Sequence, residues 1–168
     1  MVIFMCGLPK SGKTSLVEGL KLPKKVEIIS PAMFEFDELK ISDEYERKIV
    51  AWKMAVEFLS DRIKESSDDE IMLFDTCCAN ESMLDVFNLC KERNHRSLVV
   101  FVDSSVESCV SRSVDESLLD KYKDKFKRAL PQFKDAVDAI RIVHNNEDLR
   151  KARLEFSKVV AKFILGRI

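Results

Sequence analysis

The fold of this chain is decided near its start by the stretch Gly7-Leu8-Pro9-Lys10-Ser11-Gly12-Lys13-Thr14. The stretch satisfies the pattern G-x-x-x-x-G-K-[ST] at every fixed position. An apolar run, Val2–Cys6, precedes it directly, and a stretch with helical character, Thr14–Leu20, follows. A strand before the pattern and a helix after it are the context in which this pattern binds phosphates. The sequence therefore predicts a nucleoside triphosphate site at residues 7–14.

Each residue type in the loop has a physical reason. Glycine lets the backbone adopt conformations that a Cβ would forbid, so that successive N–H groups can converge on an anion. Lys13 is then placed to reach the β- and γ-phosphates, and the Thr14 hydroxyl to ligate Mg²⁺. The residues expected to bind the nucleotide are Gly7, Leu8, Pro9, Lys10, Ser11, Gly12, Lys13, Thr14 and Ser15.

The composition agrees with an ordinary globular protein that uses glycine sparingly. Two of only four glycines lie in the loop, and the chain is 46% hydrophobic and 34% charged. That mixture excludes collagen-like and disordered classes. The 28 Lys and Arg nearly cancel the 29 Asp and Glu, so a site for a polyanion has to be local. The 168 residues are expected to form one domain.

Short apolar runs alternate along the chain with longer amphipathic stretches. A continuous run of four to six apolar residues is typical of a strand of a parallel sheet that is buried on both faces. Alternation of such strands with helices predicts a three-layer α/β domain with a parallel sheet of about five strands. The predicted strands are Val2–Cys6, Val26–Ile29, Ile71–Phe74, Leu98–Val102 and Ile140–Val143.

Three apolar stripes at helical spacing lie between and after these runs. The first is expected to begin at Ser42 as its N-cap, and the last to end near Gly166. The stripes are formed by Ile49, Trp52, Val56, Leu59 and Ile63; by Met83, Val86, Phe87 and Cys90; and by Leu149, Ala152, Phe156, Val159 and Phe163.

Asp75 follows the third predicted strand and is the candidate for a second Mg²⁺ ligand. Ligands bind at the carboxyl ends of the strands in open α/β sheets, which is where Asp75 is expected. The alternative is an ordinary helix cap or turn residue. No N-K-x-D guanine motif occurs, which excludes a switch GTPase.

The chain resembles the polynucleotide kinase group of P-loop kinases, a branch of the AAA-family kinases. The resemblance rests on Pro9 within the loop, on Asp75-Thr76 after the third strand, and on Asn145 after the last strand. It also rests on a fourth strand that ends in Asp103 and leads into a short helix ending in Arg112. It implies the P-loop kinase fold, with ATP and Mg²⁺ as cofactors. The residues expected to ligate Mg²⁺ are Thr14 and Asp75, and Arg112 is expected to clamp the transferring phosphate. A surface role is the alternative for Arg112.

Two departures from the family pattern concern the catalytic residues. The family has an Asp just after the second strand, which acts as general base on the attacking hydroxyl; here the first acids are Glu35 and Asp37. Asp37 is the candidate base, and the start of a solvated helix is the alternative. The family's several lid arginines are reduced here to Arg112.

The expected activity is transfer of the γ-phosphate of ATP by Lys13, Arg112 and Asp37 to a hydroxyl acceptor. A polynucleotide 5′-hydroxyl is preferred on the resemblance alone. A small-molecule kinase of nucleosides or nucleotides and a nucleotide-binding regulatory protein without activity are the alternatives.

Weaker signals favour a soluble protein in the reducing cytoplasm. No zinc site is expected. The five cysteines are odd in number and scattered, and no apolar run is long enough to span a membrane. The basic segment 121–128 is interpreted as a solvated helix face, with Phe126 in the core. The alternative is a surface that tracks a nucleic-acid backbone, with Tyr122 or Phe126 stacked on a base. His95 is expected to contact water and Trp52 to lie in the core. Oligomeric state is left open.

Overall fold

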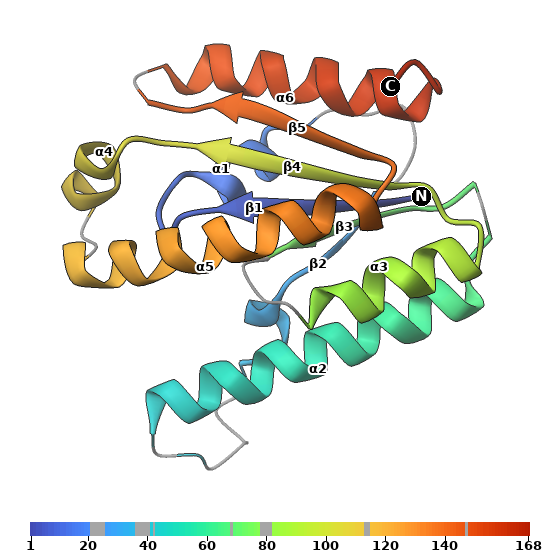
Figure 1. Cartoon of the computed structure of the whole chain (residues 1–168), viewed down its shortest axis with the longest axis horizontal. Coiled ribbons are helices and arrows are strands. Elements are labelled where there is room, and N and C mark those ends of the chain that lie inside the picture. Colours follow the sequence, from blue (N-terminus) through green and yellow to red (C-terminus); the bar gives the residue numbers. More distant parts are fainter. Residues whose placement is uncertain are drawn as a thin grey trace.

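A five-stranded parallel sheet forms the centre of the computed structural model (Figure 1). The structure describes residues 1–20, 26–35, 41, 43–67, 69–77, 82–112, 115–146 and 148–168. The predicted three-layer α/β architecture and the number of strands are confirmed. The strands are β1 (Val2–Gly7), β2 (Val26–Ile29), β3 (Ile71–Asp75), β4 (Ser97–Asp103) and β5 (Ala139–His144).

The strand order β2-β3-β1-β4-β5 places β1 at the centre of the sheet. Val2 pairs with Met72 of β3 on one side and with Ser97 of β4 on the other. From β1 the chain passes to β2 on one side of the sheet, and from β4 it passes to β5 on the other side. The direction of the connections therefore reverses between the neighbouring strands β1 and β4. Such a switch point opens a crevice at the carboxyl edge of the sheet, and the phosphate loop lies there.

Helices cover both faces of the sheet (Figure 1). On one face, α1 and α6 contribute to a core; on the other, α2, α3 and α5 do so. The left-handed residue Gly166, with φ of 67°, follows the end of α6, as predicted. The helix bounds are α1 (Lys13–Glu18), η1 (Pro31–Phe34), α2 (Glu44–Glu65), α3 (Met83–Glu92), α4 (Val106–Ser111), α5 (Glu116–Ala136) and α6 (Leu149–Ile164).

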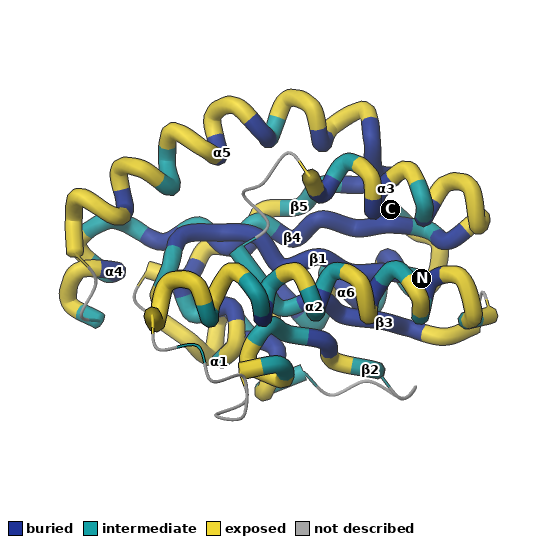
Figure 2. The backbone as a smooth tube through the Cα atoms, turned by 90° about the horizontal axis from the view of Figure 1, so that it is seen from below, coloured by how far each residue is buried: buried dark blue, intermediate teal, exposed yellow. Residues whose placement is uncertain are grey.

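The alternation of side chains along β1 supplies both cores. Phe4 packs on the face of α3 and α5, whereas Ile3 packs on the face of α1 and α6. The Phe87 ring of α3 makes edge contacts with Phe4 at 4.8 Å and with Phe133 of α5 at 4.9 Å between ring centroids. The inner strands are buried along most of their length (Figure 2). This rigid centre fixes the positions of the loops at the carboxyl edge.

The expectation of burial on both faces is wrong for the two outer strands. Ile28 of β2 is 45% exposed and Ile142 of β5 is 53% exposed. Each outer strand has a neighbouring strand on one side only. Each of these runs contains one charged residue, Glu27 or Arg141, which agrees with partial exposure. The apolar residues of the runs identified the strands correctly, but the expected burial was too high.

The buried face of α2 differs from the predicted stripe in its first half. Ala51 and Ala55 are fully buried, whereas Ile49 is 39% exposed. Alanine lets a helix approach its neighbours closely, and α2 packs closely against η1, so a stripe counted from large side chains missed this face. Trp52 is half-buried and packs against the core.

The side chain of Asp43 caps α2 by accepting a hydrogen bond from the Glu46 N–H at 2.8 Å. Ser42, the expected cap, lies outside the described residues.

The prediction that His95 contacts water is wrong. The residue is only 4% exposed, and its Nε2 lies 3.2 Å from the Ile63 carbonyl oxygen and 3.3 Å from the Ser66 hydroxyl. His95 follows a turn directly before β4, where α2 ends over the same margin of the sheet. Polar neighbours in sequence did not reveal that the ring turns inward toward these groups.

Four cysteines in the described part of the chain are free thiols: Cys6, Cys77, Cys90 and Cys109. Burial raises the pKa of the Cys90 thiol to about 12 and also raises the pKa of Cys6 and of Cys109. A raised pKa keeps a thiol protonated and unreactive. These three thiols therefore act as small apolar side chains.

Among the helices that the structure describes, none is both long and apolar enough to cross a membrane.

Candidate active site

The phosphate loop turns sharply between β1 and α1. Gly7 has φ of 144° and Gly12 has φ of 91°, both in the region that L side chains rarely adopt. A Cβ on Gly7 would also lie 2.6 Å from the Val102 carbonyl oxygen of β4. The two glycines of the motif are therefore required by the backbone itself. The Ser11 N–H closes the turn by donating to the Leu8 carbonyl at 3.1 Å.

Lys13 folds back over the loop. Its Nζ donates to the carbonyl oxygens of Gly7 at 3.0 Å and of Leu8 at 2.8 Å, and the residue is only 8% exposed. A buried ammonium needs such partners because its desolvation is costly. The carbonyl contacts hold the positive charge beside the loop, within the cavity that the loop borders.

Thr14 and Asp75 are brought together from positions 61 residues apart. The Thr14 hydroxyl donates to Asp75 Oδ2 at 2.8 Å. Asp75 is the last residue of β3 and pairs with Met5 of β1, so the sheet register places its carboxylate beside the first turn of α1. The two residues named from sequence as Mg²⁺ ligands are thus in direct contact.

Burial raises the pKa of the Asp75 carboxyl above its ordinary value. The Thr14 hydrogen bond and the positive charge of Lys13 oppose that shift but do not cancel it. Burial disfavours the ionised form, and a cation bound beside the carboxylate would favour it.

We expect Asp75 to make the metal-free protein less stable as the pH rises. Because its pKa is higher in the folded than in the unfolded chain, its contribution to stability is greatest below the unfolded value, about 3.9. The contribution is lost as the pH rises through the folded pKa. Asp75→Asn should therefore raise the unfolding midpoint by a few degrees at pH 8 in EDTA, and by much less at pH 4. The measurement is thermal unfolding by circular dichroism at both pH values.

An equal difference between the two proteins at pH 4 and at pH 8 would contradict this expectation. Asp103→Asn, at the end of the neighbouring strand β4, is the matched control. The side chain of Asp103 is about half exposed and lies 3.0 Å from His144 Nδ1, so its replacement should give no comparable stabilisation.

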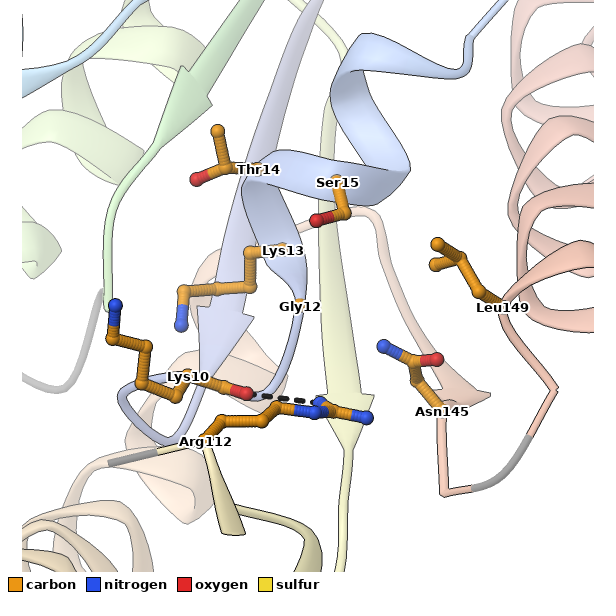
Figure 3. A pocket seen from close by; sticks show the side chains of 8 residues that line it. All are labelled: Lys10, Gly12, Lys13, Thr14, Ser15, Arg112, Asn145 and Leu149. Carbon is orange, nitrogen blue, oxygen red and sulfur yellow. Dashed lines mark hydrogen bonds between the residues drawn. The ribbon is translucent and has the colours of Figure 1, made fainter. Parts of the chain in front are cut away.

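A cavity of about 390 Å³ opens over the loop (Figure 3). Arg112, at the end of α4, lines it and donates from Nη1 to the Lys10 carbonyl oxygen at 2.9 Å. The guanidinium predicted to act on phosphate is therefore at the phosphate loop. The lining residues are Lys10, Gly12, Lys13, Thr14, Ser15, Arg112, Asn145 and Leu149.

Three residues of the site were given no role from the sequence. Ser104 follows β4, Asn145 follows β5, and Leu149 begins α6. The first two are buried and contact the Ser11 carbonyl oxygen, while Leu149 forms part of the cavity wall. Their signal in the sequence was only that Ser104 and Asn145 directly follow strands, at the edge where ligands bind.

The candidate general base, Asp37, lies outside the described residues. Glu35, the acid before it, is exposed at the end of η1. The structure thus brings together the predicted phosphate and metal residues but leaves the base as a prediction.

Oxygen donors at the loop fit Mg²⁺. Mg²⁺ is usually bound by one or two protein oxygens together with waters and substrate phosphates, and Thr14 and Asp75 provide a hydroxyl and a carboxylate in contact. In the described ranges, no group of three or more His, Cys, Asp or Glu side chains could hold a metal ion.

The basic segment 121–128 lies within α5. Phe126 is 4% exposed and packs edge-on against Phe101, as expected of a core residue. Two lysines of the segment are paired with acids one turn earlier, Lys123 with Asp120 and Lys127 with Asp124. These pairs agree with the interpretation of the segment as a solvated helix face.

No protein-family model and no curated protein matches the chain. The fold, however, is similar to that of solved structures. Shikimate kinase from Acinetobacter baumannii, in complex with shikimate, matches with a TM-score of 0.62 and 15% identity over 98% of this chain and 93% of that one. Chaetomium thermophilum Kti12, in complex with ADP-AlF3, matches with a TM-score of 0.61 and 16% identity over 96% and 98%. This chain has the fold of the P-loop kinases.

Proposed function

We propose that the protein is an ATP-dependent phosphotransferase that moves the γ-phosphate to a hydroxyl acceptor. The observation that carries the proposal is the 2.8 Å contact between Thr14 and Asp75 at the end of the phosphate loop. A carboxylate would repel a phosphate bound without a cation, so its position beside the threonine favours a site that binds phosphate together with a divalent cation. A carboxylate is useful there because it can hold a divalent cation that bridges the phosphates of ATP.

In this proposal, the residues around the cavity have distinct tasks. The loop amides and Lys13 bind the β- and γ-phosphates, and Thr14 with Asp75 would hold Mg²⁺, which neutralises phosphate charge during transfer. Arg112 lies at the edge of the loop, where its guanidinium can stabilise the negative charge of the phosphoryl group during transfer. Asp37 remains the proposed base for the acceptor hydroxyl.

Two acceptor classes are proposed. A polynucleotide 5′-hydroxyl is supported by the resemblance of the loop and of the strand ends to the polynucleotide kinase group. A small-molecule alcohol is supported by the fold similarity to shikimate kinase and by the pairing of the α5 lysines with acids. That pairing leaves less free positive charge for tracking a nucleic-acid backbone.

The test is transfer of label from γ-labelled ATP in the presence of Mg²⁺. The acceptor panel contains 5′-hydroxyl DNA and RNA oligonucleotides, nucleosides, nucleotides and hydroxy acids such as shikimate. Label on oligonucleotides alone supports the first acceptor class, and label on small acceptors alone excludes it. ADP binding without label on any acceptor would replace the kinase proposal with a regulatory, nucleotide-binding function.

A further inference from the structure

The carbonyl group of Ser11, in the middle of the phosphate loop, is held by side chains from two other loops. Asn145 Nδ2 donates to it at 2.7 Å, and the Ser104 hydroxyl lies at 3.1 Å. Asn145 is 3% exposed and Ser104 is 6% exposed. Two buried polar side chains thus converge on one peptide group of the loop.

The Asn145 amide is the principal donor of this pair. The single Ser104 hydroxyl hydrogen is shared with the Asn145 carbonyl oxygen, which lies closer, at 2.6 Å. Asn145 is fixed in turn, because its backbone N–H donates to the Asp103 carbonyl at 2.8 Å. The Ser104 hydroxyl therefore mainly secures Asn145, and the Asn145 side chain secures the loop.

Holding the Ser11 carbonyl fixes the orientation of the whole Ser11–Gly12 peptide. In a planar trans peptide, the carbonyl of one residue and the N–H of the next point in opposite directions. The Gly12 N–H is therefore held pointing away from Asn145. A Cβ on Gly12 would collide with the Asn145 amide nitrogen, so the close approach of the two residues also requires glycine at this position.

We propose that Asn145 is a positioning residue of the nucleotide site, which orients the Ser11–Gly12 peptide before a nucleotide arrives. The inference rests on the proposed nucleotide-binding function. Anion binding by backbone amides is strong only when the amides are already oriented, because otherwise the ligand has to provide the free energy of ordering the loop. Arg112 helps to orient the neighbouring Lys10–Ser11 peptide, because its guanidinium donates to the Lys10 carbonyl oxygen.

The test compares Asn145→Asp with Asn88→Asp. The first replacement is nearly isosteric but removes the amide donor and faces the Ser11 carbonyl with a second acceptor. Asn88 is exposed on α3 and provides the same change of charge away from the loop. Ser104→Ala is the milder second variant, to be used if Asn145→Asp does not fold.

Two readouts are needed, one of them independent of nucleotide. In protein labelled with ¹⁵N-glycine, the four glycines give few enough signals for Gly12 to be followed without ligand. We expect the Gly12 amide signal to shift or broaden in Asn145→Asp while that of Gly166 does not change. The dissociation constant for fluorescent ADP should rise about tenfold or more, and about threefold in Ser104→Ala. Asn88→Asp should change neither readout.

The outcomes separate this inference from the proposed function. A purely structural Asn145 would lower the unfolding midpoint but leave the ADP affinity of the folded protein unchanged, and that result would overturn the inference. If wild-type protein and Asn145→Asp bind ADP equally while Lys13→Ala does not, the nucleotide site stands and the inference fails. If the wild-type protein binds no ADP, the proposed function falls and the inference falls with it.

Discussion

Lys13→Ala is expected to lower phosphate transfer by about 10³-fold, the largest effect of any single change considered for this protein. The Lys13 ammonium already lies in the loop, bound to the carbonyls of Gly7 and Leu8. A phosphate bound to the loop would therefore meet a preformed positive charge. Alanine removes that charge and leaves two carbonyl groups without their donor. The measurement is label transfer from γ-labelled ATP, together with ADP binding by fluorescence.

Lys53→Ala is the control for this experiment. Lys53 is exposed on α2, away from the loop, and its loss makes the same change in net charge. Transfer by Lys13→Ala within threefold of the wild-type rate would show that the phosphates do not bind at residues 7–14.

Asp75→Asn is expected to lower Mg²⁺-dependent transfer on the order of 10²-fold and to raise the Mg²⁺ concentration needed for half of the maximal rate. The side-chain amide oxygen can still accept the Thr14 hydrogen bond, so the loop should keep its structure. What is lost is the negative charge that attracts the cation. The measurement is a Mg²⁺ titration of transfer at fixed ATP, and Asp103→Asn serves as the matched control.

The same substitution that impairs transfer is expected to stabilise the metal-free protein, as described above. Slower Mg²⁺-dependent transfer together with higher stability of the metal-free protein would identify Asp75 as a metal ligand, because few other roles predict both results. A turn residue or helix cap would lose stability on substitution and leave the Mg²⁺ requirement unchanged. If Asp75→Asn shows normal Mg²⁺ dependence, Asp75 is therefore an ordinary helix cap or turn residue and not a metal ligand.

The features that could be predicted from the sequence are those with local causes. The strands were recognised because a strand in a parallel sheet needs continuous apolar residues, and β1 or β3 shows this within six residues. The phosphate loop was recognised because its requirements for glycine, lysine and threonine fall within eight consecutive positions. Asp75 was recognised because the end of a strand has a defined place in the sheet.

The features that escaped prediction depend on contacts between distant parts of the chain. The inward turn of His95 depends on where α2 ends, and the buried alanine face of α2 depends on how closely the helix packs against η1. Neither the burial of His95 nor the alanine face of α2 can be predicted from the spacing of large apolar residues along the sequence. Asn145 was noticed only as a residue after a strand, because nothing near it in sequence points to the Ser11 carbonyl.

The hydrogen bonds that hold the phosphate loop connect it to residues 93, 102 and 134 positions later in the chain. The loop is made first during synthesis, but the side chains that restrain it belong to the last strands and to the helix after β4. Contacts of such long sequence separation slow the folding of small domains, and the Asn145 contact cannot form before β5 is in place. The nucleotide site is therefore completed only when β5 has joined the sheet, so the uptake of fluorescent ADP by refolding protein should follow the formation of the complete sheet.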